Sequence, residues 1–400
     1  MGDAGLPPLP SLPVPKLSNV GPGIYLLEPL SRRGYGPPLI VLTSDDESNS
    51  MTKNYVPTSV MKWAEEGFVI VQVQASATKS TDSILQNAVG ALQRCDKSET
   101  KKIGIVAYDV LVWNAIRSSL VSFPEIVGAV IYSDVDQGLQ PSPIPCVQHL
   151  HGKARFKLPR TPDLTAYEYP TSKSQQFATP VSPDFDYALE AVSHTRNLTF
   201  FKRPDVLAGP IFDLEKIWDE HTYYEFENRS VAHTMATMVQ EPYVNHVPTL
   251  TGGIGREELT DFYTNHFIFS NPEDVELELI SRTVGIDRVV DEFIFKCTHN
   301  RTIDWLLPTV PPTNVYLEIP MMAIVNIRGD RLYHEHISWD QATVLRQIGV
   351  LPEYLPWKQT VSEAPLEIQI PVAGKETAMK MREKSSVPSN AMFAFEMRQL

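Results

Sequence analysis

Short apolar runs alternate with amphipathic stretches through the first half of the chain, and they constrain its fold more than any other feature. Runs such as PLIVLT, FVIVQVQ and KIGIVAY are nearly continuous and rich in β-branched residues. Such runs, when helices separate them, are typical of a parallel sheet that is covered on both faces. We therefore predict an α/β fold, with strands at residues 38–43, 68–74, 102–108, 127–132 and 145–150 and helices near residues 59–66, 82–94, 110–121 and 183–202.

The second half begins with helices and continues with long extended runs. The run from Val275 to Val284 alternates apolar and charged residues, which is the period of a half-buried strand. A predicted hairpin joins residues 315–328 to residues 331–339 through Gly329-Asp330. Helices followed by long, bent antiparallel strands predict an α+β cone with one open mouth. In the remaining run, from Arg288 to Thr298, one face carries Val289, Asp291, Phe293, Phe295 and Cys297.

The length of 400 residues exceeds one ordinary hydrophobic core and indicates two domains. Pro and Gly residues between positions 203 and 210 interrupt the preceding helix and mark the predicted boundary. We expect a poorly ordered, Pro-rich leader at residues 1–19, an α/β domain at residues 20–205, and the α+β cone with a C-terminal tail at residues 206–400.

The composition excludes several classes of partner. A formal net charge of −13 argues against nucleic acid and anionic membranes, because both require clustered Lys and Arg. Cys95, Cys146 and Cys297 lie far apart without a CxxC pair, which fits a reducing compartment and indicates neither disulfides nor a zinc site. No apolar run reaches the roughly 18 residues of a membrane span, and the N-terminus lacks the pattern of a signal peptide. We therefore expect a cytoplasmic protein.

Over roughly residues 20–203, the pattern of strands and helices resembles the α/β-hydrolase fold, and dienelactone hydrolases in particular. Where these enzymes carry a nucleophile on a Gly-rich elbow, the chain reads Ala107-Tyr108-Asp109-Val110-Leu111-Val112. Lys153-Ala154-Arg155 and Gln175-Gln176 stand at the positions of the triad acid and histidine, so the resemblance implies a scaffold without a recognisable triad. Two interpretations of Asp109 remain open: a helix N-cap, or the nucleophile of an ester or lactone hydrolase.

Three segments of the second half resemble the SnoaL-like group within the nuclear-transport-factor-2-like fold, which polyketide cyclases and limonene-type epoxide hydrolases share. The segments are THNRTIDWLLPTVPPT, RLYHEHISWD and VLRQIGVLP, beginning at Thr298, Arg331 and Val344. The two-domain arrangement resembles fungal and bacterial proteins described as dienelactone-hydrolase-like. The resemblance implies cofactor-free and metal-free chemistry on a hydrophobic small molecule in secondary metabolism, and by analogy a homodimer.

The last predicted strand offers a candidate acid–base group. Its alternation places His334, His336, Ser338 and Asp340 on one face and Glu335, Ile337 and Trp339 on the other. A histidine and a carboxylate that share a pocket can exchange a proton. SnoaL-like cyclases resemble this arrangement with a His-x-Asp pair, whereas here His336-x-Ser338 lacks the carboxylate and Asp340 would have to replace it. The alternative is that His336 and Asp340 only order the end of the strand.

The stretch from Phe212 to Arg256 is predicted to form one wall of the pocket, as an acidic aromatic helix followed by a short strand. Tyr243 and Asn245 resemble the Tyr-x-Asn pair that holds the attacking water in limonene-type epoxide hydrolases. An offset of one residue leaves open whether Asn245 or His246 points inward. His221, in the segment Trp218-Asp219-Glu220-His221, either contributes to the pocket mouth or belongs to a helix face that packs Trp218.

The same epoxide hydrolases use an Arg-x-Asp pair, which Arg288 and Asp291 approach with one extra residue, so that Arg282 is a possible substitute for Arg288. We therefore predict an enzyme that opens an epoxide by hydrolysis or cyclisation on a polyketide- or terpenoid-like molecule. Asp340 and Asp291 are the expected base and acid, and His336 tunes them. The expected substrate-binding residues are Tyr243, Asn245, His246, His221 and Trp339. The alternatives are the hydrolase based on Asp109 and a non-catalytic binding protein.

Overall fold

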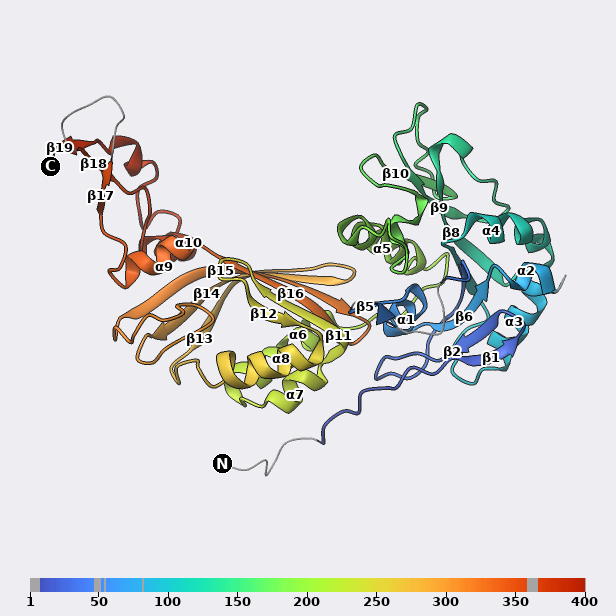
Figure 1. The fold of residues 1–400 in the computed structure, drawn as a ribbon, viewed down its shortest axis with the longest axis horizontal. Helices are drawn as coiled ribbons and strands as arrows, with labels where there is room; N and C mark the ends of the chain where they lie inside the picture. The colour runs from blue at the N-terminus through green and yellow to red at the C-terminus, as the bar shows by residue number, and fades with distance from the viewer. Residues whose placement is uncertain (1–7, 47–51, 54, 81–82, 358–365, 400) are drawn as a thin grey trace. The chain divides into compact units, whose positions relative to one another are not determined.

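The computed structural model describes residues 8–46, 52–53, 55–80, 83–357 and 366–399. The chain forms two compact units, which are shown as ribbons in Figure 1. Unit 1 comprises Met1–Ile217, Ala236–Glu241 and Ile327–Leu332, and unit 2 comprises Trp218–Met235, Pro242–Asn326 and Tyr333–Leu400. The main division therefore falls at Ile217 and Trp218, later than the predicted boundary.

The first unit is built on an eight-stranded sheet with the order β1-β2-β6-β3-β7-β8-β9-β10. Strand β2 is antiparallel to both of its neighbours, β1 and β6, and the six strands from β6 to β10 in this order run parallel; the apolar runs predicted five of these six. The short strands β1 and β2 were not predicted, and neither was β10, whose sequence LTAYEY lacks a continuous apolar run. The strands are β1 (Ser18–Gly21), β2 (Ile24–Leu27), β3 (Pro38–Thr43), β6 (Val69–Gln74), β7 (Ile103–Ala107), β8 (Ile126–Asp134), β9 (Cys146–His151) and β10 (Leu164–Tyr169), and a separate pair is β4 (Thr52–Lys53) with β5 (Val56–Pro57).

The helices of the first unit lie close to their predicted positions. The helix predicted at 110–121 ends earlier, because α4 (Val110–Ile116) gives way to the 3₁₀ helix η1 (Arg117–Ser122). The others are α1 (Ser59–Glu65), α2 (Ala77–Ser80), α3 (Ile84–Arg94) and α5 (Tyr187–Phe201), with short 3₁₀ turns η2 (Val135–Gln137) and η3 (Gln175–Ala178).

The second sheet has six strands in the order β12-β11-β16-β15-β14-β13, and the predicted hairpin joins β15 to β16. Gly329 makes the tight turn at a φ of 59°. Helices α6, α7 and α8 gather along this sheet (Figure 1). The strands are β11 (Met238–His246), β12 (Thr251–Ile254), β13 (Glu276–Val284), β14 (Arg288–Thr298), β15 (Tyr316–Arg328) and β16 (Arg331–Trp339), and the helices are α6 (Leu214–Thr222), α7 (Val231–Ala236) and α8 (Gly255–Phe262).

Two of these helices end in π-helical turns. The turn η4 (Tyr223–Glu227) continues α6, and η5 (Tyr263–Phe267) continues α8. Such turns are rare and occur frequently at functional sites. The C-terminal part forms a small three-stranded sheet and short helices: α9 (Gln341–Gln347), β17 (Tyr354–Trp357), β18 (Leu366–Gln369), α10 (Glu376–Arg382), η6 (Ala391–Ala394) and β19 (Arg398–Gln399).

Of the predicted Pro-rich leader, residues 1–7 lie outside the described part of the chain. Residues 8–17 form neither helix nor strand, and β1 begins at Ser18, inside the range predicted as leader. Within the described residues, no helix is long and apolar enough to cross a membrane.

Candidate functional site

A cavity lies inside unit 2, between its helices and the inner face of the six-stranded sheet. The centres of water molecules can occupy about 40 Å³ of this cavity. The total space between the surrounding atoms, including the open mouth, is about 460 Å³. Thr222, Phe226, Leu277 and Phe293 are half-buried and mark the open side, whereas the other lining residues are buried. These buried residues are Trp218, Glu225, Val244, His246, Phe262, Tyr263, Phe267, Phe295, Trp305, Met321, Glu335 and Ile337.

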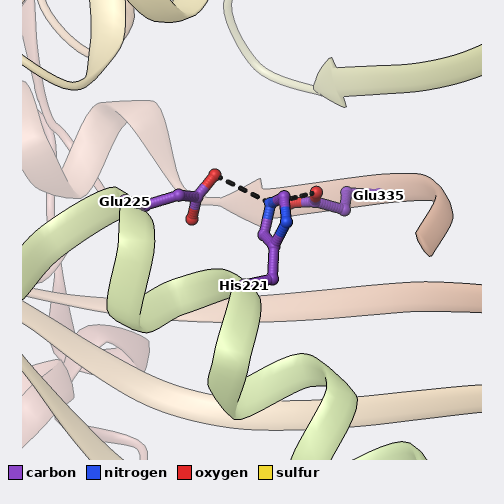
Figure 2. Close-up of side chains that lie close together, drawn as sticks. All are labelled: His221, Glu225 and Glu335. Carbon is purple, nitrogen blue, oxygen red and sulfur yellow. Dashed lines mark hydrogen bonds and ion pairs between the residues drawn. The ribbon is translucent and has the colours of Figure 1, made fainter. Parts of the chain in front are cut away.

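Three ionisable side chains, His221, Glu225 and Glu335, meet beside this cavity, and we call them the His–Glu–Glu cluster. His221 lies in α6 and Glu225 in the π turn η4, so that a spacing of four residues brings both to one side of the helix. Glu335 comes from the middle of β16, a strand with neighbours on both sides. Figure 2 shows the imidazole between the two carboxyl groups, which reach it from the helix and from the strand.

A single nitrogen of His221 faces both acids. Its Nε2 lies 3.1 Å from Oε1 of Glu225 and 3.1 Å from Oε1 of Glu335. The one proton on this nitrogen can point at only one carboxyl oxygen, and the hydrogen bond is made to Glu225. Oε1 of Glu335 is fully buried and forms an ion pair with this nitrogen, without a well-aligned hydrogen bond from the described residues. The hydroxyl of Tyr263 completes the group, 3.5 Å from the same nitrogen and hydrogen-bonded to Glu225.

Burial and charge act in opposite directions on this cluster. Burial alone would lower the pKa of His221, but Glu225 and Glu335 outweigh it and raise the pKa to about 10. The imidazole is therefore protonated at neutral pH. Burial raises the pKa of Glu225 above its ordinary value, although His221 and Tyr263 counteract it. The cluster thus joins a cation, a carboxyl group that holds its proton unusually well, and a second carboxyl group.

His246 is a second buried histidine of the same cavity and behaves in the opposite way. In the described part of the chain it forms no ion pair with a carboxylate; its Nδ1 lies 3.2 Å from the hydroxyl of Thr251, and its ring stacks on Phe267. Burial lowers its pKa to about 3, so that it is neutral at physiological pH. The uncertainty between Asn245 and His246 is thereby resolved, because His246 lines the cavity whereas Asn245 falls on the opposite face of β11.

Asp291 lies on the inner face of β14, as predicted, and Arg282 is its partner in place of Arg288. Nε and Nη2 of Arg282 donate to the two carboxylate oxygens of Asp291, each at 2.8 Å. The indole Nε1 of Trp218 also donates to Asp291, at 2.8 Å, and its ring stacks on His221. Nη1 of Arg282 donates to Asp219. Asp291 is therefore fully engaged in holding α6 against the sheet.

The alternation along β16 is confirmed, but the face that we predicted to carry the chemistry does not line the cavity. Glu335 and Ile337 line the cavity, whereas His334 and His336 stack on one another and contact Tyr243 on the opposite face. Burial, and secondarily the charge of Arg288, lower the pKa of His336.

Asp340 does not meet Asp291. It is exposed and forms the N-cap of α9, where Oδ1 accepts from the backbone N–H of Ala342 and Oδ2 from the hydroxyl of Thr343. Trp339 belongs to the aromatic packing around the cavity, with its ring centroid 5.9 Å from His246 and 5.5 Å from Trp305.

In the first unit, Asp109 is the N-cap of α4. Its Oδ1 accepts from the backbone N–H groups of Leu111 and Val112, at 2.8 and 3.3 Å. This is the structural interpretation of the two that the sequence left open.

Sequence reasoning missed Glu225, Glu335 and Tyr263. Two signals were available: the His-x-x-x-Glu spacing on the predicted helix, and the apolar neighbours Ile337 and Trp339 that mark the inner face of the last strand. Within the described residues, the His–Glu–Glu cluster is a group of side chains that could hold a metal ion. One ligand atom from each of its three residues lies within 4.8 Å of the others. A metal would first have to displace the proton of His221.

No protein-family model and no curated protein matches the chain. Comparison with solved structures finds SnoaL-like proteins that cover about a third of it. One is a putative SnoaL-like polyketide cyclase from Jannaschia sp. CCS1, with 16% identity and a TM-score of 0.28, over 36% of this chain and 98% of that one. Another is an epoxide hydrolase/cyclase-like enzyme of pyran ring formation in the polyether salinomycin, with 12% identity and a TM-score of 0.25, over 32% of this chain and 93% of that one. None of these neighbours bears on the resemblance of the first half to dienelactone hydrolases, which remains a prediction.

Proposed function

We propose that unit 2 is a cofactor-free acid–base enzyme that opens an epoxide on an apolar small molecule. The observation that carries the proposal is the His–Glu–Glu cluster, in which two buried carboxyl groups share one imidazole nitrogen at the wall of a largely apolar cavity. Asp291 and Asp340, the acid and base expected from sequence, are respectively held by Arg282 and capping a helix.

The cluster supplies both proton transfers that the reaction needs. Glu225, whose pKa burial raises, donates its proton to the oxirane oxygen as the carbon–oxygen bond breaks. Glu335 takes a proton from the attacking water or substrate hydroxyl as the new carbon–oxygen bond forms. His221 lies between them and returns the proton from Glu335 to Glu225 after turnover. The apolar lining excludes bulk water and fits a polyketide- or terpenoid-like substrate.

The test is turnover of a panel of small apolar epoxides by the full chain, with products identified by mass spectrometry in ¹⁸O-labelled water. Glu225→Gln and Glu335→Gln should each lower kcat by about 10²-fold or more, which is the usual contribution of one acid or base. Glu273→Gln is the matched control, because this carboxylate is exposed and lies outside the cavity. Full activity of both cluster variants would refute the assignment of residues, and the absence of turnover of every epoxide by the wild type would refute the reaction.

A further inference from the structure

The cavity combines aromatic walls with acidic groups. Eight of its sixteen lining residues are Phe, Tyr or Trp. Its charged lining residues within the described chain are Glu225 and Glu335, and neither Lys nor Arg lines it. Aromatic faces attract cations through their quadrupole, and the attraction is strongest where water is excluded. A ligand that enters therefore meets two features that favour positive charge.

The carboxyl group of Glu335 specifies what such a ligand must carry. Glu335 is only 3% exposed and lines the cavity, and its Oε1 is ion-paired with His221 at 3.1 Å without a well-aligned hydrogen bond from the described residues. Burial makes an incompletely hydrogen-bonded carboxylate costly, so a bound group that donates a hydrogen bond is favoured at this point.

We propose that the cavity binds small organic ammonium ions, with an ammonium N–H donating to the carboxyl group of Glu335 and the aromatic walls enclosing the positive charge. The space of about 40 Å³ for water centres limits the enclosed part to a small head group. Larger substituents leave through the open side, past Phe226 and Phe293.

This inference rests on the cavity of the proposed function and places the ammonium ion where the attacking water gives up its proton. Ammonium ions should therefore inhibit epoxide opening in competition with the substrate. Ammonium binding is measured without turnover, so the ammonium site and the epoxide-opening activity can fail separately. Ammonium binding without epoxide turnover would leave the ammonium site intact, whereas epoxide turnover without ammonium binding would overturn the ammonium site.

The experiment is isothermal titration calorimetry of the full chain at neutral pH and constant ionic strength. The three probes are trimethylammonium, tetramethylammonium and tert-butanol, which respectively offer charge with an N–H, charge alone, and similar size without charge. Trimethylammonium should bind at least tenfold more tightly than tetramethylammonium, and tert-butanol should not bind measurably. Glu335→Gln should abolish the preference for trimethylammonium, Phe293→Leu should weaken both cations, and Glu273→Gln should change neither.

Three results would overturn the proposal. The first is binding of tert-butanol as tight as that of the ammonium ions, which would show that the cavity recognises apolar shape and not positive charge. The second is unchanged trimethylammonium affinity in Glu335→Gln, provided that circular dichroism shows the variant to be folded. The third is saturable binding of ZnCl₂ without binding of either ammonium ion, which would make the cluster a metal site.

Discussion

Two buried histidines of one cavity should carry different charges at the same pH. His221 is 0% exposed and its pKa is raised to about 10 by Glu225 and Glu335 against the effect of burial, whereas burial lowers the pKa of His246 to about 3. Between these values, His221 should be an imidazolium ion and His246 a neutral imidazole. The perturbations that test this are pH itself and Glu335→Gln, which removes one of the two acids facing His221.

The sign and the size of the effect on stability follow from linkage. The pKa of His221 rises on folding from 6.5 to about 10, so its stabilisation is complete below pH 6.5 and is lost as the pH rises to 10. At about 1.4 kcal/mol per pKa unit, the full effect is on the order of 5 kcal/mol for this buried group. His246 has a depressed folded pKa, so it costs stability increasingly as the pH falls from 6.5 towards 3. These two groups together favour greatest stability near pH 6.5.

The assay is a pH titration of the imidazole Cε1–H resonances by NMR, assigned with His221→Asn and His246→Asn, alongside urea unfolding at several pH values. Glu335→Gln should lower the pKa of His221 by about 1–3 units, the usual effect of one nearby opposite charge, and should flatten the alkaline loss of stability. Exposed His266 serves as an internal reference. A His221 resonance that titrates at or below pH 6.5 would refute the reasoning, because the two carboxyl groups would then not outweigh burial.

Four further variants test the remaining assignments. Asp291→Ala should cost unit 2 about 3 kcal/mol in urea unfolding, at the low end for a broken buried ion pair because the Arg282 side chain stays 13% exposed; a cost below 1 kcal/mol would contradict the pairing. Asp340→Ala and Asp109→Ala should each cost only about 1 kcal/mol, the value of one N-cap, and should leave epoxide turnover unchanged; loss of turnover in either would return that residue to the chemistry. Tyr263→Phe removes a hydrogen bond that lowers the pKa of Glu225, so the limb of the pH–rate profile that reports Glu225 should move to higher pH; an unmoved limb would separate Tyr263 from the acid.

The sequence predicts the central strands of both sheets because the spacing of apolar side chains reports which faces are buried. Along β16, period-two alternation correctly separates His334 and His336 from Glu335 and Ile337. The prediction that His334 and His336 face the cavity differs from the structure because it gives histidine more weight than burial. The apolar residue Ile337 belongs to the face that must be buried, and Glu335 shares that face, so the burial argument alone would have placed Glu335 in the cavity.

Other parts of the site leave weaker traces in the sequence. Asp340 directly precedes a helical pattern, where a short acidic side chain is an ordinary N-cap, so this role can be predicted from the sequence. The π turns η4 and η5 could not be predicted, because one π turn of five residues is too short to alter the helical spacing of apolar residues in a recognisable way. These turns set the positions of Glu225 and Tyr263. The meeting of Glu335 with His221 is a tertiary contact between distant segments, and neither segment encodes it alone.

A buried histidine in the first unit shows why we place the chemistry in unit 2. His149 is fully partnered: its Nδ1 lies 2.7 Å from the Tyr169 hydroxyl and its Nε2 2.7 Å from Oδ1 of Asn197. Burial lowers its pKa to about 3, so it is a neutral imidazole with one N–H donated to Asn197 and one nitrogen accepting from Tyr169. Such a satisfied network fixes a core and has no remaining site for a substrate. Glu335 differs in this respect, because its carboxyl group lines a cavity and its Oε1 has the ion pair with His221 but no well-aligned hydrogen bond from the described residues, and a ligand or a water molecule is what would complete it.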